Sequence, residues 1–436
     1  MTTFSKFPVK PNQNWTVQRI GECCLVGDGI HAKVKRQDSG VLYLTAKNLK
    51  PNSLNLSKVD YISGQDFERH FCRNIQAIRK PEAGDVLFGI IGSIGEPYLV
   101  QPEDYFGISS SVAILRPNQH LISPLYLYYW VKTPIFQNAL HGLKAGVVQS
   151  YVSLESLKSL PIYYPDLPTQ YKITEILSDY DSLIANNDRR IQLLETMAQT
   201  VYYEWFVKLN LPHLEMRRAT DLEREVTGKE MFPVGWKVEA IGDVVDTIGG
   251  DTPSKKKPEY WANGTLMWYR TTDLTASGTM FISESANKIT DLGRRNSKIR
   301  VFPPYSVMMT SRATIGVVAI NTTEASTNQG FITCIPNEQL SAYYLYFWIK
   351  ENRDWIFSLA SGLMYREINL SGFRKLPIAL PDRHIHRQFI DTLDPLCSEI
   401  QALQAKNSTL KRTRALLLAK LLSGEVDIAD RFCQIA

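Results

Sequence analysis

The chain repeats itself, and this repetition limits the possible folds more than any other feature of the sequence. The heptapeptide YLYYWVK begins at Tyr126, and its near copy YLYFWIK begins at Tyr344. Three other pairs recur in the same order: WTVQRIGE with WKVEAIGD, SIG with TIG, and VSLESLKSLPIYYPD with INLSGFRKLPIALPD. Their separations drift only from 221 to 216 residues. Since a fixed long period marks duplicated structural units, two copies of one domain are predicted.

Each copy begins with a globular part that mixes strands and helices. Short β-branched and aromatic runs, broken by Gly, Pro, Asn and Asp, predict strands joined by tight turns. Ser123 and Pro124 precede the first heptapeptide, as a cap and a first-turn proline would, so this segment is predicted to be helical. Its residues Leu127 and Trp130 then share one face, which favours core packing, with base stacking as the alternative.

Each copy ends in a long helix. Apolar residues alternate in steps of four and three from Ile173 to Trp205 and again from Phe389 to Leu421, which predicts two heptad seams. We expect the helices to pair antiparallel, in a register that places Asn187 against Asn407 and Tyr180 against Arg414. The alternative is that each helix packs only on its own domain.

Composition and motif searches argue against catalysis by this chain. The 436 residues suffice for two domains, and a net charge of +5 permits a polyanionic partner without requiring one. The sequence lacks the phosphate-binding loop, the Asn/Asp-Pro-Pro-aromatic motif of amino-methyltransferases and the Asp/Glu-x-Lys motif of metal-dependent nucleases. The segment GDGIHA from Gly27 lacks the sequence context of a dinucleotide-binding site. Neither the seven histidines nor the six cysteines have metal-ligand spacing. No cofactor or metal is therefore expected in this chain.

The expected compartment is the cytoplasm. No uninterrupted apolar run approaches the roughly 18 residues of a membrane span. The first residues, MTTFSKFPVKPNQNW, lack the apolar core of a signal peptide.

Two basic loops at corresponding places are the strongest candidates for contact with DNA. The first copy has His31, Lys33, Lys35 and Arg36 beside two glycines, and the second has Lys255, Lys256 and Lys257 beside two glycines and an aromatic pair. Cations on a glycine-opened loop can approach a phosphate backbone closely. An ordinary solvated loop is the alternative for each, but the shared location favours function.

Further candidates follow predicted strands, where Arg, Asn, Gln and Lys could reach base edges or phosphates. They are Lys47, Asn48, Gln149, Arg270, Thr271, Ser311, Arg312, Gln329, Tyr365 and Arg366.

Several phrases carry a family resemblance: FPVGWKVEAIGDV from Phe232, GGDTPSKKKPEYW from Gly249, and the two LPI-x-x-P segments at Leu160 and Leu376. With the duplicated plan, they resemble the specificity subunit of type I restriction–modification systems. The resemblance implies an α+β fold. Two similar globular α/β target recognition domains, related by pseudo-two-fold symmetry, would be separated by two long antiparallel helices that form a coiled coil. Residues 1–160 and 213–378 would be the domains, and 161–212 and 379–436 the helices that space them and dock partners.

The same resemblance implies a non-catalytic, DNA-binding role. Each domain would read one half of a bipartite, asymmetric double-stranded target. The coiled coil would set the gap and dock two modification subunits, which use S-adenosylmethionine, before ATP-dependent restriction (translocase) subunits join, with no membrane involved. A coiled-coil scaffold and a solitary restriction or modification enzyme are the alternatives.

The chain departs from the family where each long helix begins, because the family often has Pro-Pro-x-x-Glu-Gln there. The first copy keeps Gln170 but has Thr169 in place of the acid, and the second has Gln388 two residues late.

Overall fold

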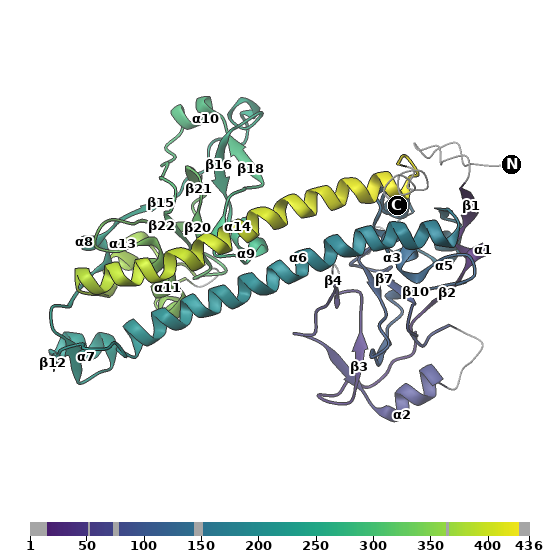
Figure 1. Ribbon diagram of the computed structural model, residues 1–436, viewed down its shortest axis with the longest axis horizontal. Coiled ribbons are helices and arrows are strands. Elements are labelled where there is room, and N and C mark those ends of the chain that lie inside the picture. Colours follow the sequence, from purple (N-terminus) through teal and green to yellow (C-terminus); the bar gives the residue numbers. More distant parts are fainter. Residues whose placement is uncertain (1–14, 51–52, 73–77, 144–150, 363–365, 427–436) are drawn as a thin grey trace, which may run out of the picture. The chain divides into compact units, whose positions relative to one another are not determined.

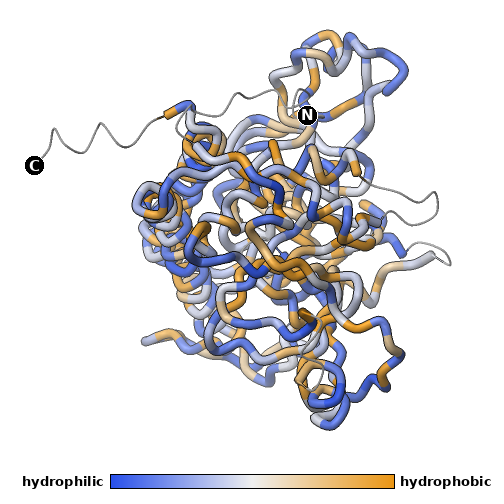
Figure 2. The backbone as a smooth tube through the Cα atoms, turned by 90° about the vertical axis from the view of Figure 1, so that its right-hand side faces the viewer, coloured by the Kyte–Doolittle hydropathy of each residue, from blue (hydrophilic) through white to orange (hydrophobic). Residues whose placement is uncertain are grey.

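The computed structural model of the protein describes residues 15–50, 53–72, 78–143, 151–362 and 366–426. The chain forms two compact units, one of residues 1–186 with 407–436 and the other of residues 187–406. Each unit has its own buried cores. Hydrophobic and hydrophilic stretches alternate over short distances along the backbone (Figure 2).

The first unit combines four small sheets. Its strands are β1 Thr16–Arg19, β2 Cys24–Asp28, β3 Val41–Leu44, β4 Leu49–Lys50, β5 Ser53–Leu54, β6 Asp60–Ile62, β7 Val86–Gly89, β8 Pro97–Leu99, β9 Phe106–Ile108, β10 Val112–Pro117 and β11 Pro161–Tyr164. The strand orders are β2-β10-β7-β8, β6-β3-β9, β1-β11 and β4-β5. All pairs are antiparallel except β3 with β9.

The second unit repeats this topology with additions. Its strands are β12 Met216–Arg218, β13 Met231–Pro233, β14 Lys237–Ala240, β15 Asp246–Gly249, β16 Leu266–Tyr269, β17 Phe281–Ile282, β18 Asn287–Ile289, β19 Val307–Thr310, β20 Val318–Asn321, β21 Ala325–Thr327, β22 Phe331–Ile335 and β23 Pro377–Leu380. The orders β15-β22-β19-β20-β17, β18-β16-β21 and β14-β23 match three sheets of the first unit, while β12-β13 is an addition. This shared topology confirms the predicted duplication.

Short helices accompany the sheets in both units. The first unit has α1 Ile20–Cys23, α2 Gly64–Phe67 with the π-helical turn Glu68–Cys72, α3 Pro124–Lys132, α4 Pro134–Gly142 and α5 Leu154–Lys158. The second has α7 Asp221–Thr227, α8 Ile241–Val244, the 3₁₀ turn Pro258–Tyr260, α9 Thr271–Ser277, α10 Asp291–Arg295, α11 Ala342–Glu351, α12 Arg353–Ser358 and α13 Leu370–Arg374.

The repeated heptapeptide forms α3 and α11, and both helices are core elements. Proline occupies the first turn of α3 after its cap Ser123, as predicted. The ring of Tyr126 is fully buried, and its hydroxyl donates to the carbonyl of Tyr163 on β11 at 2.7 Å. Its counterpart Tyr344 donates to the carbonyl of Ala379 on β23 at 2.6 Å. The core interpretation is therefore confirmed, since the repeated aromatic residues tie each helix to the end of its own domain.

The two long helices are α6, Leu167–Tyr202, which continues as the π-helical turn Tyr203–Val207, and α14, Arg383–Leu422 (Figure 1). In the first unit, the beginning of α6 packs against the end of α14, and Ile173 shares a buried core with Leu421. In the second unit, the rest of α6 packs against the beginning of α14, and Ala198 shares a core with Phe389. Within each unit the helix segments run antiparallel, as the heptad seams predict. The same cores include domain residues, so each segment packs both on its partner and on its domain.

A buried polar residue ties each long helix to its domain. In the first unit, Gln170 accepts a hydrogen bond from the backbone N–H of Ser123 at 2.8 Å and donates to the carbonyls of Leu121 and Pro165. In the second unit, Nε2 of His386 accepts from the N–H of Ser341 at 3.1 Å. The structural counterpart of Gln170 is thus His386, whereas Gln388 is exposed. Burial lowers the pKa of His386 to about 4, so its ring stays neutral.

Candidate nucleic-acid interface

The basic loop of each unit starts where glycine allows the backbone to lie against a neighbouring segment. A Cβ atom on Gly29 would lie 2.1 Å from the carbonyl oxygen of Ile108, and one on Gly250 would lie 2.0 Å from that of Asn328. No other residue fits at such distances. The two loops are therefore anchored in the same way, which supports their comparison.

Carboxylates hold two of the first loop's predicted DNA-binding residues. His31 lies 2.8 Å from Asp28, and Arg36 lies 3.3 Å from Asp60 on β6. The guanidinium of Arg36 also stacks 3.9 Å from the ring centre of Tyr43, whose pKa is raised by burial. Lys33 and Lys35 are exposed. The structure therefore presents a cationic loop whose arginine is oriented by an acid and an aromatic ring.

Lys47 and Asn48 follow β3 and have different surroundings. Lys47 is exposed, whereas Asn48 is only 5% exposed. The Asn48 side chain accepts from the backbone N–H and hydroxyl of Thr45 and donates to the carbonyls of Asn55 and Lys58. Because these bonds use both ends of its amide, Asn48 stabilises the turn, and its contact with DNA stays a prediction.

The second loop presents its lysines more openly. Lys255 and Lys256 are exposed and make no ion pair with the described residues. Lys257 lies 5.0 Å from the ring centre of Tyr260 and donates to its hydroxyl at 3.0 Å, a hydrogen bond that raises the pKa of the ammonium group. Exposed lysines on a loop are the side-chain type that contacts the phosphate backbone.

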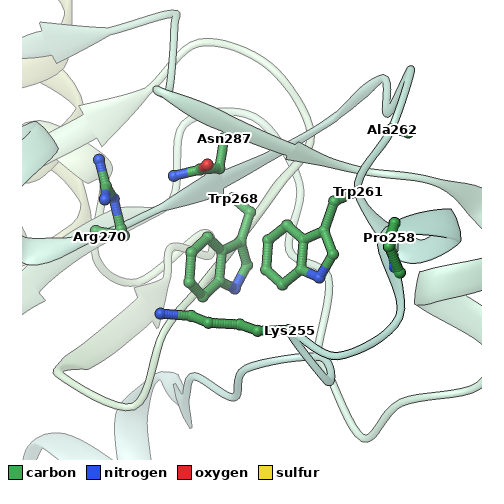
Figure 3. A pocket seen from close by; sticks show the side chains of 7 residues that line it. All are labelled: Lys255, Pro258, Trp261, Ala262, Trp268, Arg270 and Asn287. Atoms are coloured by element: carbon green, nitrogen blue, oxygen red, sulfur yellow. The ribbon is translucent and has the colours of Figure 1, made fainter.

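A cleft of 490 Å³ opens beside these lysines (Figure 3). We call it the indole cleft. It is lined by Lys255, Pro258, Trp261, Ala262, Trp268, Arg270 and Asn287. The two indole rings meet edge to face, with centres 4.9 Å apart. This arrangement unites Lys255 and Arg270, two of the predicted residues, with an aromatic wall.

Arg270 and Gln329 border the same loop. Arg270 precedes α9, of which Thr271 is the half-buried first residue, and its guanidinium lies 3.6 Å from Asp273. Gln329 is exposed, donating to Asp251 at 3.0 Å and accepting from the hydroxyl of Thr252 at 2.7 Å. Gln329 therefore braces the beginning of the lysine loop.

Arg312 and Arg366 lie near each other in the second unit, because Arg312 pairs with Glu367, the neighbour of Arg366. Arg312 is exposed and pairs with Glu367 at 2.7 Å, whereas Ser311 is only 2% exposed. The guanidinium of Arg366 lies 5.0 Å from the ring centre of Phe357. Gln149 and Tyr365 lie outside the described residues.

The predicted coiled-coil residues lie in the helix seams. Asn187 and Asn407 are 4% and 3% exposed, and the amide of Asn407 donates to the carbonyl of Ile184 at 3.3 Å. Arg414 forms an ion pair with Asp181, the neighbour of its predicted partner Tyr180. Asp181 also accepts a hydrogen bond from Tyr129 at 2.8 Å. The pairing of Asn187 with Asn407 would join the two units and stays a prediction.

Metal-ligand clusters and membrane-spanning helices are both absent from the described residues. Within residues 15–426, leaving aside the segments not described, no cluster of His, Cys, Asp or Glu could hold a metal ion. None of the helices described is both long and apolar enough to cross a bilayer.

Comparison with known proteins identifies the domains. A family model described as "Type I restriction modification DNA specificity domain" matches residues 12–196 and again residues 233–412. The chain belongs to this family. It carries two copies of the specificity domain, as the resemblance implied.

Relatives of similar length support the assignment. The chain is 24% identical to the "Type I restriction enzyme HindI specificity subunit" of Haemophilus influenzae over 409 residues, covering 80% of this chain and 88% of the relative. It is 29% identical to the "Type I restriction enzyme MjaIX specificity subunit" of Methanocaldococcus jannaschii over 201 residues, 46% of each chain. The fold is similar to the crystal structure of a type I restriction–modification S subunit from M. genitalium, with a TM-score of 0.53 at 14% identity, covering 95% of this chain and 98% of that one.

Sequence reasoning missed two kinds of residue in the specificity domains. Asp28, Asp60 and Glu367 hold His31, Arg36 and Arg312 in place, and only Asp28 lies close in sequence to the residue that it pairs with, so only this pair could have been expected from the sequence. Trp261 and Asn287 line the indole cleft. Trp261 stands at the end of the quoted lysine phrase, but Asn287 reaches the cleft through the pairing of β18 with β16, which the sequence does not disclose.

Proposed function

We propose that this chain is the DNA-specificity subunit of a type I restriction–modification complex and is not itself catalytic. One observation carries the proposal: two specificity domains of the same topology present different side chains at corresponding loops. Arg36 is held by an acid in the first domain, whereas Lys255 and Lys256 project from the second. Two domains that share a topology but differ in their contact surfaces are suited to a DNA target whose two half-sites differ in sequence.

The four-part division of the chain belongs to the same proposal. Residues 1–160 and 213–378 each read one half-site, with Lys33, Lys35, Arg36 and Lys47 in the first domain and the residues of the lysine loop in the second. Residues 161–212 and 379–436 set the separation. A stiff helical spacer fixes half-site spacing, as symmetry does in dimeric DNA-binding proteins.

The helices also supply the docking surface for two modification subunits. These partners would bring S-adenosylmethionine, and restriction subunits would bring ATP, so this chain needs no cofactor of its own. The complex would work on double-stranded DNA in the cytoplasm.

Methylome sequencing of a host with and without this gene tests the proposal. Loss of one split adenine-methylation motif, with all other motifs retained, is the expected result. A host that keeps its modification subunit yet shows no change in methylation would point to a coiled-coil scaffold instead. Methylation by the purified chain alone would point to a solitary enzyme.

A further inference from the structure

The indole cleft occupies a place that the first unit fills with its own side chain. Tyr43 on β3 lies opposite Asp60 on β6, and Trp268 on β16 lies opposite Asn287 on β18. The two three-stranded sheets have the same order, and each central strand also pairs in parallel with a third strand. Trp268 and Asn287 are thus the counterparts of Tyr43 and Asp60.

In the first unit, a planar group already covers the aromatic ring. The guanidinium of Arg36 stacks on Tyr43 and pairs with Asp60 through its edge. The site therefore accommodates a planar group that stacks on the ring and interacts through its edge with the residue on the neighbouring strand.

In the second unit the equivalent place is open. The cleft has a volume in the range of pockets that hold small ligands, and no carboxylate lines it. The side chain of Asn287 makes no hydrogen bond with the described residues, and Nε of Arg270 is buried without a partner among them. The Asn287 amide and the exposed part of the Arg270 guanidinium, which lies 3.6 Å from Asp273, are therefore available to a ligand, whereas the buried Nε is not.

The aromatic wall is held in position before any ligand binds. The indole N–H of Trp268 donates to the carbonyl of Asp251 at 3.0 Å, and that of Trp261 donates to the carbonyl of Ser254 at 3.1 Å. Because both indole N–H groups donate to the backbone, the half-buried ring of Trp261 offers only its carbon edge and π face, and Trp268, which is 2% exposed, supports it. In Figure 3 the side chain of Lys255 runs alongside both rings, and its ammonium group lies on the same side of the cleft as Arg270.

The chemistry of the cleft specifies its ligand. Two cations without a lining acid favour a negatively charged group, the indole faces favour an aromatic plane, and the Asn287 amide can both donate and accept at a base edge. A nucleotide combines these three properties. A base inside a duplex is stacked on both faces, so only an unstacked base can lie against an indole.

We propose, on the basis of the proposed DNA-binding function, that the indole cleft takes one unstacked nucleobase of the bound DNA. Trp261, supported by the buried Trp268, stacks against the base, Asn287 binds its edge, and Lys255 and Arg270 neutralise the adjoining phosphate. The first domain, where Arg36 fills this place, has no such site.

The test compares the affinity of the full chain for two short duplexes of one sequence, one fully paired and one carrying a single bulged nucleotide. We expect the bulged duplex to bind about tenfold more tightly, the effect of one base–aromatic stack. Trp261→Leu should bring the ratio of the affinities for the bulged and paired duplexes down to about one. Trp355→Leu, at a partly exposed tryptophan of the same unit that does not line the cleft, should retain it.

A second variant keeps the test valid if Trp261→Leu fails to fold. Asn287→Ala should alter the order of affinities for duplexes that carry each of the four bulged bases. Equal affinity of the chain for paired and bulged duplexes would overturn the proposal. So would a Lys255→Ala variant that weakens both equally while Trp261→Leu weakens neither, because the cleft edge would then bind phosphate alone. A chain that binds neither duplex would instead refute the DNA-binding function on which the inference rests.

Discussion

Individual basic residues in the two domains have different freedom to meet DNA. In the first domain, Arg36 is oriented by Asp60 and Tyr43, which lowers the entropic cost of placing it but leaves less charge to neutralise phosphate. In the second domain, Lys255 and Lys256 are exposed cations without an ion pair among the described residues. The electrostatic part of binding should therefore depend strongly on the second loop.

Replacing Lys255, Lys256 and Lys257 together with Ala should reduce the salt dependence of DNA binding by the chain. Each lost phosphate contact lowers the slope of log affinity against log salt by about 0.9, so a fall of about 2 to 3 is expected. A triple Ala variant at Lys172, Lys406 and Lys411, exposed residues of the long helices, removes the same charge and should leave the slope unchanged. Equal slopes for both triple variants and the parent chain would show that the loop does not touch phosphate.

His386 should make the second unit sensitive to acid. Its pKa in the folded chain is about 4, below the ordinary value of 6.5, so between these values only the unfolded chain takes up the proton. The contribution of the neutral ring to the free energy of unfolding is fully present above pH 6.5 and is lost as the pH drops towards 4. Between pH 7 and pH 5 the loss is about 2 kcal/mol. His386→Gln, which introduces the residue used at Gln170, should remove this part of the pH dependence in urea unfolding.

The exposed neighbour His384 provides the control for that measurement. His384→Gln changes the same residue type outside the buried site and should leave the pH dependence as it is. If His386→Gln unfolds with the same pH profile as the parent chain, the buried neutral histidine does not contribute.

At the scale of elements, the regular features could be predicted from the sequence and the exceptions depended on tertiary contacts. The heptad seams predicted α6 and α14, and the repeat predicted that α3 and α11 are equivalent core helices. The burial of Asn48 could not be predicted, because its hydrogen bonds to Asn55 and Lys58 depend on how the chain turns back after β4. The role of His386 was missed because it is a different residue type from Gln170. Its neutral imidazole nitrogen nevertheless accepts the same backbone hydrogen bond as the Gln170 amide oxygen.

The long helices should act as a ruler. Insertion of seven residues after Asn186 in α6 and seven before Asn407 in α14 adds one heptad to each seam without changing its phase. The added length is about 10 Å, so the gap in the methylated motif should widen by about 3 base pairs while both half-sites stay the same. Insertion into α6 alone, which breaks the pairing, should abolish methylation. An unchanged gap in the double insertion variant would contradict the ruler.

At the scale of the whole molecule, duplication has separated the residues that maintain the fold from those that contact DNA. The repeated cores, such as the bonds of Tyr126 and Tyr344 to their strands, hold the same topology in both units. The loops of the two units differ, because the first has the Arg36–Asp60 ion pair and the second has the indole cleft. The domains can therefore change their contacts independently.

The most direct measurement is the methylation motif of a host in which residues 1–160 come from a relative of different specificity. The motif should change in one half only, with the gap and the other half retained. Exchange of residues 213–378 should change the opposite half. A change in both halves after either single exchange would contradict the central claim that each copy of the domain reads its own half of the target.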